Sequence, residues 1–180
     1  YRLKLSRPYR INDIAYRMKD TTLKRIMLTG KENSLIHEGQ IYNVSLLDDE
    51  RYRLTDLLRN EGYYFFSPEF IFYEIDSTVG NHKMKIIQNV EQVRYPSDTN
   101  PARYLERDHY RYYIDKILIN PDFNPIRTDT SNMDVYVNNS DRLVSRYRIY
   151  YRDKLRIRPR ALRNSIFIEP FELYSQKEQQ

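Results

Sequence analysis

The sequence predicts an α+β fold, in which a strand–helix–helix–strand–strand unit is followed by the start of a second such unit. Three observations lead to this prediction. Tyr and other apolar residues alternate with polar residues in several short stretches, as in strands with one packed and one solvated face. The leucines between Leu47 and Leu58 have helical spacing. Two short motifs recur downstream, which indicates tandem modules.

Composition excludes several classes of protein. The chain has 180 residues, of which 40% are hydrophobic and 31% are charged, which is too apolar for a disordered chain. No stretch approaches the roughly 18 uninterrupted apolar residues of a membrane-spanning helix. Cysteine is absent, which excludes a disulfide scaffold, a thiol nucleophile and a cysteine-based metal site. The chain begins at Tyr1 without an apolar signal region, so we expect part of a longer protein, with residues 1–8 ending a preceding module.

The first strand and the first helix are predicted from local signals. Residues 9–18 alternate like a strand, with Ile among the apolar members. Thr21 and Thr22 offer an N-cap for a short helix over residues 23–28, and Gly30 is placed to end it.

The second helix has the clearest start signals. Ser45 with Asp48 resembles a capping box, and Asn43 is an alternative N-cap. We expect Asp48, Asp49 and Glu50 in the first turn, where the helix dipole favours acids. That position accounts for the three carboxylates without a catalytic site.

The apolar face of this helix and its end are also predicted. Four leucines share one face: Leu47, Leu54, Leu57 and Leu58. Asn60 and Gly62 supply a stop, and Gly62 permits the bend into the next strand. We expect the aromatic run from Tyr63 to Phe66 to hold the corner between helix and sheet, since it offers large apolar area with polar tips.

A hairpin and a linker follow. Residues 69–76 and 83–93 are predicted strands, joined by a turn at Gly80 and Asn81. The first domain therefore spans residues 9–93. The polar residues 94–108 are predicted to link it to the next domain.

The second domain is predicted from an internal repeat. "YRINDIAY" at residues 9–16 matches "YYIDKILI" 103 positions later, and "EGQIYN" at 38–43 matches "PFELYS" 132 positions later. The difference places an insertion near residues 120–145 of a partial second domain, 109–180. Gly39 is matched by Phe171, so we expect the loop of the second copy to bend differently.

These motifs resemble one known family. The strand "YxIxxI", the loop "LIHEGQIYN" and the run "LLDDERYRLTDLLRNEGYYFFSPEFIFYEIDS" resemble a POTRA (polypeptide-transport-associated) domain, most like the translocation-and-assembly-module lipoproteins of the TamL/TamA type. The resemblance covers residues 9–93 and the first part of the following copy. It implies β-α-α-β-β modules, each with a three-stranded mixed sheet covered on one face by two helices.

The resemblance also implies a function. Such domains lie at the periplasmic face of the outer membrane in Gram-negative-type bacteria and serve in outer-membrane protein assembly or translocation. The implied partners are unfolded outer-membrane barrel proteins and accessory assembly subunits. The implied role is that of a scaffold and not of an enzyme, and we expect neither a cofactor nor a metal.

The expected binding site is the backbone of the second strand. An edge strand presents unpaired N–H and C=O groups, to which an extended polypeptide can add as a further strand. In the family this is the usual docking edge, and here it comprises Phe70, Ile71, Phe72, Tyr73, Glu74 and Ile75. Either Phe70 and Phe72 or the set containing Ile71 must face the helices.

An alternative site is the basic segment 142–163, which contains nine Lys or Arg and one acid. As a strand it places cations on one face and aromatics on the other. The candidate anion or lipid contacts are Arg146, Arg148, Arg152, Arg156 and Arg158. Such a face can bind single-stranded nucleic acid or anionic lipid head groups, of which the resemblance favours the lipid. A solvated charged face explains the same pattern without a ligand.

Overall fold

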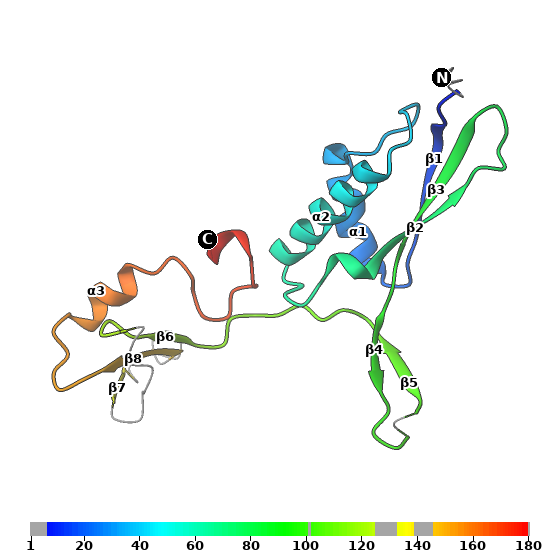
Figure 1. Cartoon of the computed structure of the whole chain (residues 1–180). Helices are drawn as coiled ribbons and strands as arrows, with labels where there is room; N and C mark the ends of the chain where they lie inside the picture. The colour runs from blue at the N-terminus through cyan, green and yellow to red at the C-terminus, as the bar shows by residue number, and fades with distance from the viewer. Residues whose placement is uncertain (1–6, 101, 125–132, 139–145, 180) are drawn as a thin grey trace, which may run out of the picture. The chain divides into compact units, whose positions relative to one another are not determined.

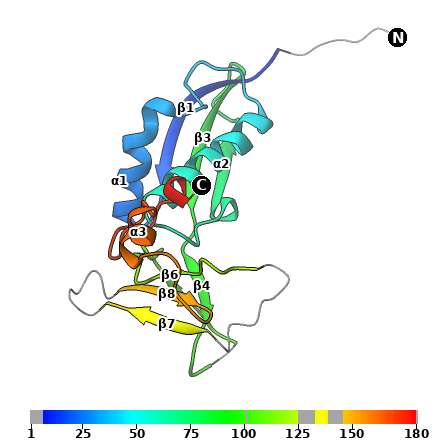
Figure 2. The same cartoon turned by 90° about the vertical axis from the view of Figure 1, so that its left-hand side faces the viewer.

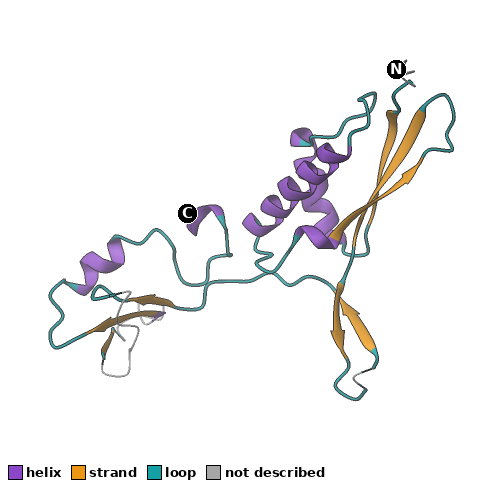
Figure 3. Ribbon diagram, in the orientation of Figure 1, coloured by secondary structure: helices purple, strands orange, loops and turns teal. Residues whose placement is uncertain are grey.

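A computed structural model describes residues 7–100, 102–124, 133–138 and 146–179. The chain divides into two compact units, Tyr1–Tyr110 and Arg111–Gln180, which are described separately as unit 1 and unit 2. The predicted α+β fold class is confirmed (Figure 3). Most of residues 1–8 and much of the predicted insertion at 120–145 lie outside the described residues. No helix in the described ranges is long and apolar enough to cross a bilayer.

Unit 1 has the predicted order of elements. They are β1 (Arg10–Arg17), α1 (Thr21–Thr29), a 3-10 turn (Gly30–Asn33), α2 (Val44–Asn60), β2 (Ile71–Asp76) and β3 (Lys83–Val90). The sheet order is β1-β3-β2, with β1 parallel and β2 antiparallel to the central β3. Both helices pack against one face of this mixed sheet (Figures 1 and 2).

The caps of both helices differ from part of the prediction. Asp20, and not Thr21 or Thr22, caps α1 by accepting the backbone N–H groups of Thr22 and Leu23 at 2.9 and 3.0 Å. Asn43 caps α2, so the alternative cap holds and the Ser45 capping box does not form. Because α2 begins at Val44, the three acids of residues 48–50 lie beyond the first turn.

The core of unit 1 lies between the helices and the sheet. One buried cluster comprises Leu23, Met27, Leu54, Leu58, Tyr63, Phe66 and Ile71. A second comprises Ile11, Ile36, Leu47 and Ile86. Each such side chain contributes about 1.5–3 kcal/mol when it is fully removed from water. Three of the four predicted leucines are therefore in the core, and Leu57 packs against it.

Only two of the four aromatic residues 63–66 pack into the corner between α2 and β2. Gly62 adopts φ 93°, which permits the predicted bend. Tyr63 and Phe66 are 2% and 1% exposed, whereas Tyr64 and Phe65 are 47% and 67% exposed. Arg59 Nε donates to the Phe66 carbonyl at 2.8 Å and fixes the turn to the helix. The structural role predicted for the run thus applies to Tyr63 and Phe66.

Residues 94–108, predicted as a linker, contain a hairpin. Its strands are β4 (Val93–Pro96) and β5 (Tyr104–Arg107), paired antiparallel. The predicted third strand, 83–93, therefore ends early as β3, and its last residue begins β4. Lys19 forms an ion pair with Glu106 at 3.0 Å, so side-chain contacts as well as the chain tie the hairpin to the rest of unit 1.

Unit 2 contains a second small mixed sheet. Its elements are β6 (Ile117–Ile119), β7 (Asp134–Val137), β8 (Tyr147–Tyr151), α3 (Pro159–Asn164) and a terminal 3-10 turn (Lys177–Gln179). The order is β6-β8-β7, with β6 parallel and β7 antiparallel to β8. Of the repeated motif "YYIDKILI", only the last three residues join this sheet, as β6.

The predicted repeat is visible in the backbone. In the first copy, Ile11 N–H bonds to Gln40 O at 2.9 Å, Gly39 N–H to Ile11 O at 2.7 Å, and Tyr42 N–H to Tyr9 O at 2.9 Å. In the second copy, Ile114 N–H bonds to Glu172 O at 2.9 Å, Phe171 N–H to Ile114 O at 2.6 Å, and Tyr174 N–H to Tyr112 O at 2.9 Å. In each pair of equivalent bonds, the strand residues differ by 103 positions and the loop residues by 132, as the sequence repeat predicts.

The repeated loop also bends in the same way, contrary to expectation. Phe171 adopts φ 71°, close to the 82° of Gly39. A residue with a side chain thus occupies a left-handed conformation, because the three hydrogen bonds of the loop require it. The two units differ in what precedes the loop: α1 and a 3-10 turn in unit 1, but β7, β8 and α3 in unit 2.

Candidate functional site

The predicted docking strand lies at an edge of its sheet. Pro68 begins a 3-10 turn, Pro68–Phe70, so Phe70 precedes the strand and β2 starts at Ile71. β2 pairs with β3 along one side. Along its other side, no strand of the described chain pairs with it.

The burial of the β2 side chains shows which of its two apolar faces packs against the helices. Ile71 is 1% exposed and Tyr73 packs against both core clusters, so this set faces the helices. Phe72 points to the outer face and is 36% exposed. Ile75 belongs by alternation to the set of Ile71 but is 37% exposed. Phe70 packs against the core from the turn before the strand.

The direction of the backbone groups follows from one hydrogen bond. The Phe70 carbonyl accepts Glu91 N–H at 2.9 Å, in register with the β2–β3 ladder. Residues of an antiparallel strand face the partner alternately, so Phe72 and Glu74 also bond toward β3. The N–H and C=O of Tyr73 and Ile75, with the Ile71 carbonyl, point to the open side. Ile71 N–H is already donated to the Pro68 carbonyl.

A hollow beside Phe72 adds a side-chain contact area on the outer face. Its volume is about 400 Å³, and β1, β2, β3 and the β4–β5 hairpin line it. The ion pair between Arg17 and Glu74, at 2.9 Å, spans the outer face from β1 to β2. An added strand would therefore find a half-exposed aromatic ring and alternating charges next to the open backbone.

The polar core near β2 is structural. Burial raises the pKa of the Tyr73 hydroxyl, with a further contribution from the Glu50 carboxylate. Glu50 is 2% exposed and is paired with Arg53 at 2.7 Å. Both groups are held inside unit 1, where the Glu50–Arg53 pair joins α2 to the packed core.

His109 is half-buried beside the aromatic residues at the start of β2. Its ring lies 4.8 Å from the Phe66 ring and 4.6 Å from the Phe70 ring, between centroids. Its Nε2 lies 2.8 Å from the Glu91 carbonyl. Burial lowers the pKa of this imidazole, which favours its neutral form. The histidine therefore buttresses the start of β2. Among the described residues, no cluster of His, Asp or Glu could hold a metal ion.

The five arginines of the alternative site do not form one surface. β8 alternates as predicted, with Tyr147 and Ile149 buried and Arg148 on the opposite face. Arg146 precedes the strand and is paired with Asp115 at 2.6 Å. The strand ends at Tyr151, and Asp153 then adopts φ 56° and turns the chain.

Beyond that turn, Arg152 N–H bonds to Asp122 Oδ2 at 3.0 Å, Arg156 is exposed, and Arg158 is the N-cap residue of α3. Arg158 also lines a pocket, together with Arg160 and Arg163, which do not belong to the five predicted arginines. Pro159 followed by arginines three residues apart is the signal that could have placed them on one short helix. The part of the basic segment before residue 146 lies outside the described residues.

The chain matches no protein-family model and no curated protein sequence. Unit 1 thus contributes an open sheet edge beside a half-exposed aromatic ring, and unit 2 contributes a pocket with three guanidinium groups.

Proposed function

We propose that this chain is a polypeptide-docking module of an outer-membrane protein assembly or translocation machine, and that it acts by β-augmentation at β2. In this role the chain is a scaffold without catalytic activity, at the periplasmic face of the outer membrane. Its partners are unfolded barrel proteins and accessory assembly subunits. The proposal identifies unit 1 as a POTRA domain of the TamL/TamA type, in keeping with the motifs of residues 9–93.

The open edge of β2 is the observation that carries the proposal. Main-chain groups at Ile71, Tyr73 and Ile75 point away from β3, at the spacing that an added strand requires. Main-chain bonding tolerates many client sequences. The β-α-α-β-β order with a mixed β1-β3-β2 sheet, expected from the resemblance, supports the same assignment.

The repeated loop supports a modular scaffold. Three equivalent backbone hydrogen bonds join the loop to the first strand in each unit. Such recurrence is typical of arrays in which one structural unit is used more than once.

The alternative function, binding of nucleic acid or anionic lipid through Arg146, Arg148, Arg152, Arg156 and Arg158, has weaker support. Arg146 is tied to Asp115, and the segment turns after Tyr151. Binding of this kind would weaken steeply as salt is raised.

A peptide titration followed by NMR tests the proposal. The probe is an unstructured peptide with alternating apolar and polar residues, of the kind that forms barrel strands. We expect saturable amide shifts concentrated in residues 70–76. Shifts confined to the described part of the basic segment, with none in β2, would overturn β-augmentation and favour the alternative.

A further inference from the structure

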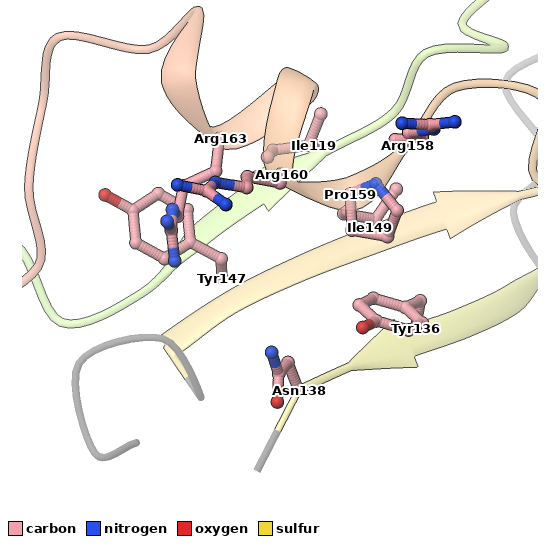
Figure 4. A pocket seen from close by; sticks show the side chains of 9 residues that line it. All are labelled: Ile119, Tyr136, Asn138, Tyr147, Ile149, Arg158, Pro159, Arg160 and Arg163. Atoms are coloured by element: carbon pink, nitrogen blue, oxygen red, sulfur yellow. The ribbon is translucent and has the colours of Figure 1, made fainter. Parts of the chain in front are cut away.

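A pocket in unit 2 combines an apolar floor with a cationic rim. Its volume is about 500 Å³, and it lies between the sheet and α3 (Figure 4). Ile119, Tyr136 and Ile149 contribute from β6, β7 and β8 respectively. All three strands of this sheet thus supply apolar surface to one hollow.

The rim carries three positive charges. Arg158, Arg160 and Arg163 line the pocket, and the described residues of its lining include no carboxylate. Figure 4 shows Arg160 and Arg163 at the end near Tyr147, and Arg158 at the other end. The spacing of Arg160 and Arg163 places them on one face of α3, where like charges repel each other. Among the described residues, none of the three forms an ion pair.

Neighbouring acids do not supply the missing counter-charge. Glu169 and Glu172 act electrostatically on Tyr147, as does Arg163. However, Glu172 Oε2 accepts the backbone N–H of Glu169 at 2.9 Å and is directed at its own loop. The hydroxyl of Tyr147 donates to the Ile168 carbonyl at 3.3 Å. Within the described part of the chain, the guanidinium groups therefore remain available to an external anion.

We propose that this pocket binds a small amphiphilic anion. Arg160 and Arg163 hold its phosphate or carboxylate head, with Arg158 adding charge, and its apolar body lies over Ile149 and Tyr136. The planar fork of an arginine matches two oxygens of such a head group, and two arginines can share it. The floor excludes a fully polar ligand from most of the pocket. This binding function is separate from polypeptide docking at β2.

The test uses the full chain and three probes of graded chemistry: hexyl phosphate, inorganic phosphate and hexanol. We expect hexyl phosphate to give saturable NMR shifts at Tyr136, Tyr147 and Ile149. Inorganic phosphate should bind more weakly, and hexanol should not saturate the site. Equal affinity for hexyl phosphate and inorganic phosphate would overturn the role of the apolar floor.

Two variants distinguish anion binding at the pocket from nonspecific attraction by the basic segment. Arg160→Gln should weaken hexyl phosphate binding roughly tenfold, because one charge-assisted contact is lost. Lys154→Gln is the matched control, since Lys154 is exposed in the same segment but neither lines the pocket nor belongs to the five arginines of the alternative site. Equal losses in both variants would overturn the proposal. Both positions are exposed, so unchanged amide spectra should confirm that each variant folds.

A vesicle assay identifies the source of the anion. Phosphatidylcholine vesicles with and without phosphatidylglycerol are sedimented with the wild-type chain and with Arg160→Gln. Sedimentation that requires both phosphatidylglycerol and Arg160 assigns the pocket to a lipid head group. Hexyl phosphate binding without sedimentation assigns it to a free amphiphile. Sedimentation that is unchanged in Arg160→Gln would argue against the pocket as the anion site.

Discussion

At the residue scale, the carboxylate of Glu50 joins α2 to the segment after α1. Its oxygens accept hydrogen bonds from the Ser34 hydroxyl at 2.9 Å, the Leu35 backbone N–H at 2.8 Å and Arg53 Nη2 at 2.7 Å. A buried carboxylate is tolerable only when it is satisfied in this way. The sequence analysis placed Glu50 in the first turn of the helix and did not predict its burial, because helix periodicity does not show which polar residue points inward.

We expect Glu50→Gln to lower the free energy of unfolding by about 2–3 kcal/mol, because bonds to a charged acceptor become neutral and Arg53 loses its partner. Urea denaturation measures the change. The control is Asp48→Asn, which breaks the half-exposed pair with Arg51 on the same helix and should cost no more than about 1 kcal/mol. Equal costs would show that the buried pair adds nothing beyond a surface pair.

Gly39 and Phe171 provide a second comparison at this scale, since they have the same backbone conformation. A Cβ built on Gly39 meets no atom within 4 Å, so a substitution there adds backbone strain without a clash. We expect Gly39→Ala to destabilise unit 1 by about 1–2 kcal/mol. In Phe171 the Arg146 guanidinium lies 5.1 Å from the ring centroid and offsets part of the same strain.

Thermal or urea unfolding of Gly39→Ala checks this prediction, and Gly39→Asn is its control. Asn tolerates the left-handed region better than Ala does, so it should cost less. An unchanged stability in Gly39→Ala would mean that the loop can relax to a different bend.

At the element scale, the open edge of β2 allows a test of docking that depends on backbone groups alone. The N–H of Ile75 points away from β3, so proline at this position removes an outward donor and places its ring on the open side. We expect Ile75→Pro to weaken peptide docking roughly tenfold or more. Ile75→Ala keeps the N–H and should retain docking. Similar affinities for the two variants in the peptide titration would place docking elsewhere.

The sequence predicted the elements whose patterns are local. The spacing of the leucines in α2, the alternation in β3 and the turn signal at Gly62 all act within a few neighbouring residues. The β4–β5 hairpin was missed because each strand has only four residues and the polar stretch shows no clear alternation. The start of β2 was placed too early because Pro68 begins a 3-10 turn, which pattern alone does not distinguish from a strand.

The candidate sites also differ in whether the sequence alone could predict them. The edge strand could be predicted because the alternation in residues 69–76 indicates a strand and the family resemblance indicates that this strand lies at the edge. The cationic pocket could not, because it depends on β6, β7, β8 and α3 meeting in space. Segments that pair in parallel over long separations, such as β6 with β8, leave no local mark.

At the scale of the whole molecule, the two units have the same relation between strands but reach it by different chain orders. In unit 1 the central strand β3 follows the repeated loop and α2. In unit 2 the central strand β8 precedes that loop. The predicted insertion at residues 120–145 thus contributes one strand, β7, to the sheet, and does more than lengthen a connection. The loop geometry is maintained in both cases by the same three backbone hydrogen bonds.

The two units differ in the size of their apolar cores, and this difference predicts which unit unfolds locally more often. Within the described residues, the buried apolar side chains of unit 2 are Tyr147, Ile149 and Pro170, whereas both core clusters lie in unit 1. Local stability follows buried apolar contact, so amides of β8 should exchange with solvent at least roughly tenfold faster than those of β3. Hydrogen exchange followed by NMR measures both strands in one sample. A fragment of residues 1–110 is the control and should keep the β3 protection of the full chain. Equal protection of β3 and β8 in the full chain, together with loss of the β3 protection in the fragment, would show that the chain unfolds as one cooperative body and that the small core of unit 2 does not limit its stability.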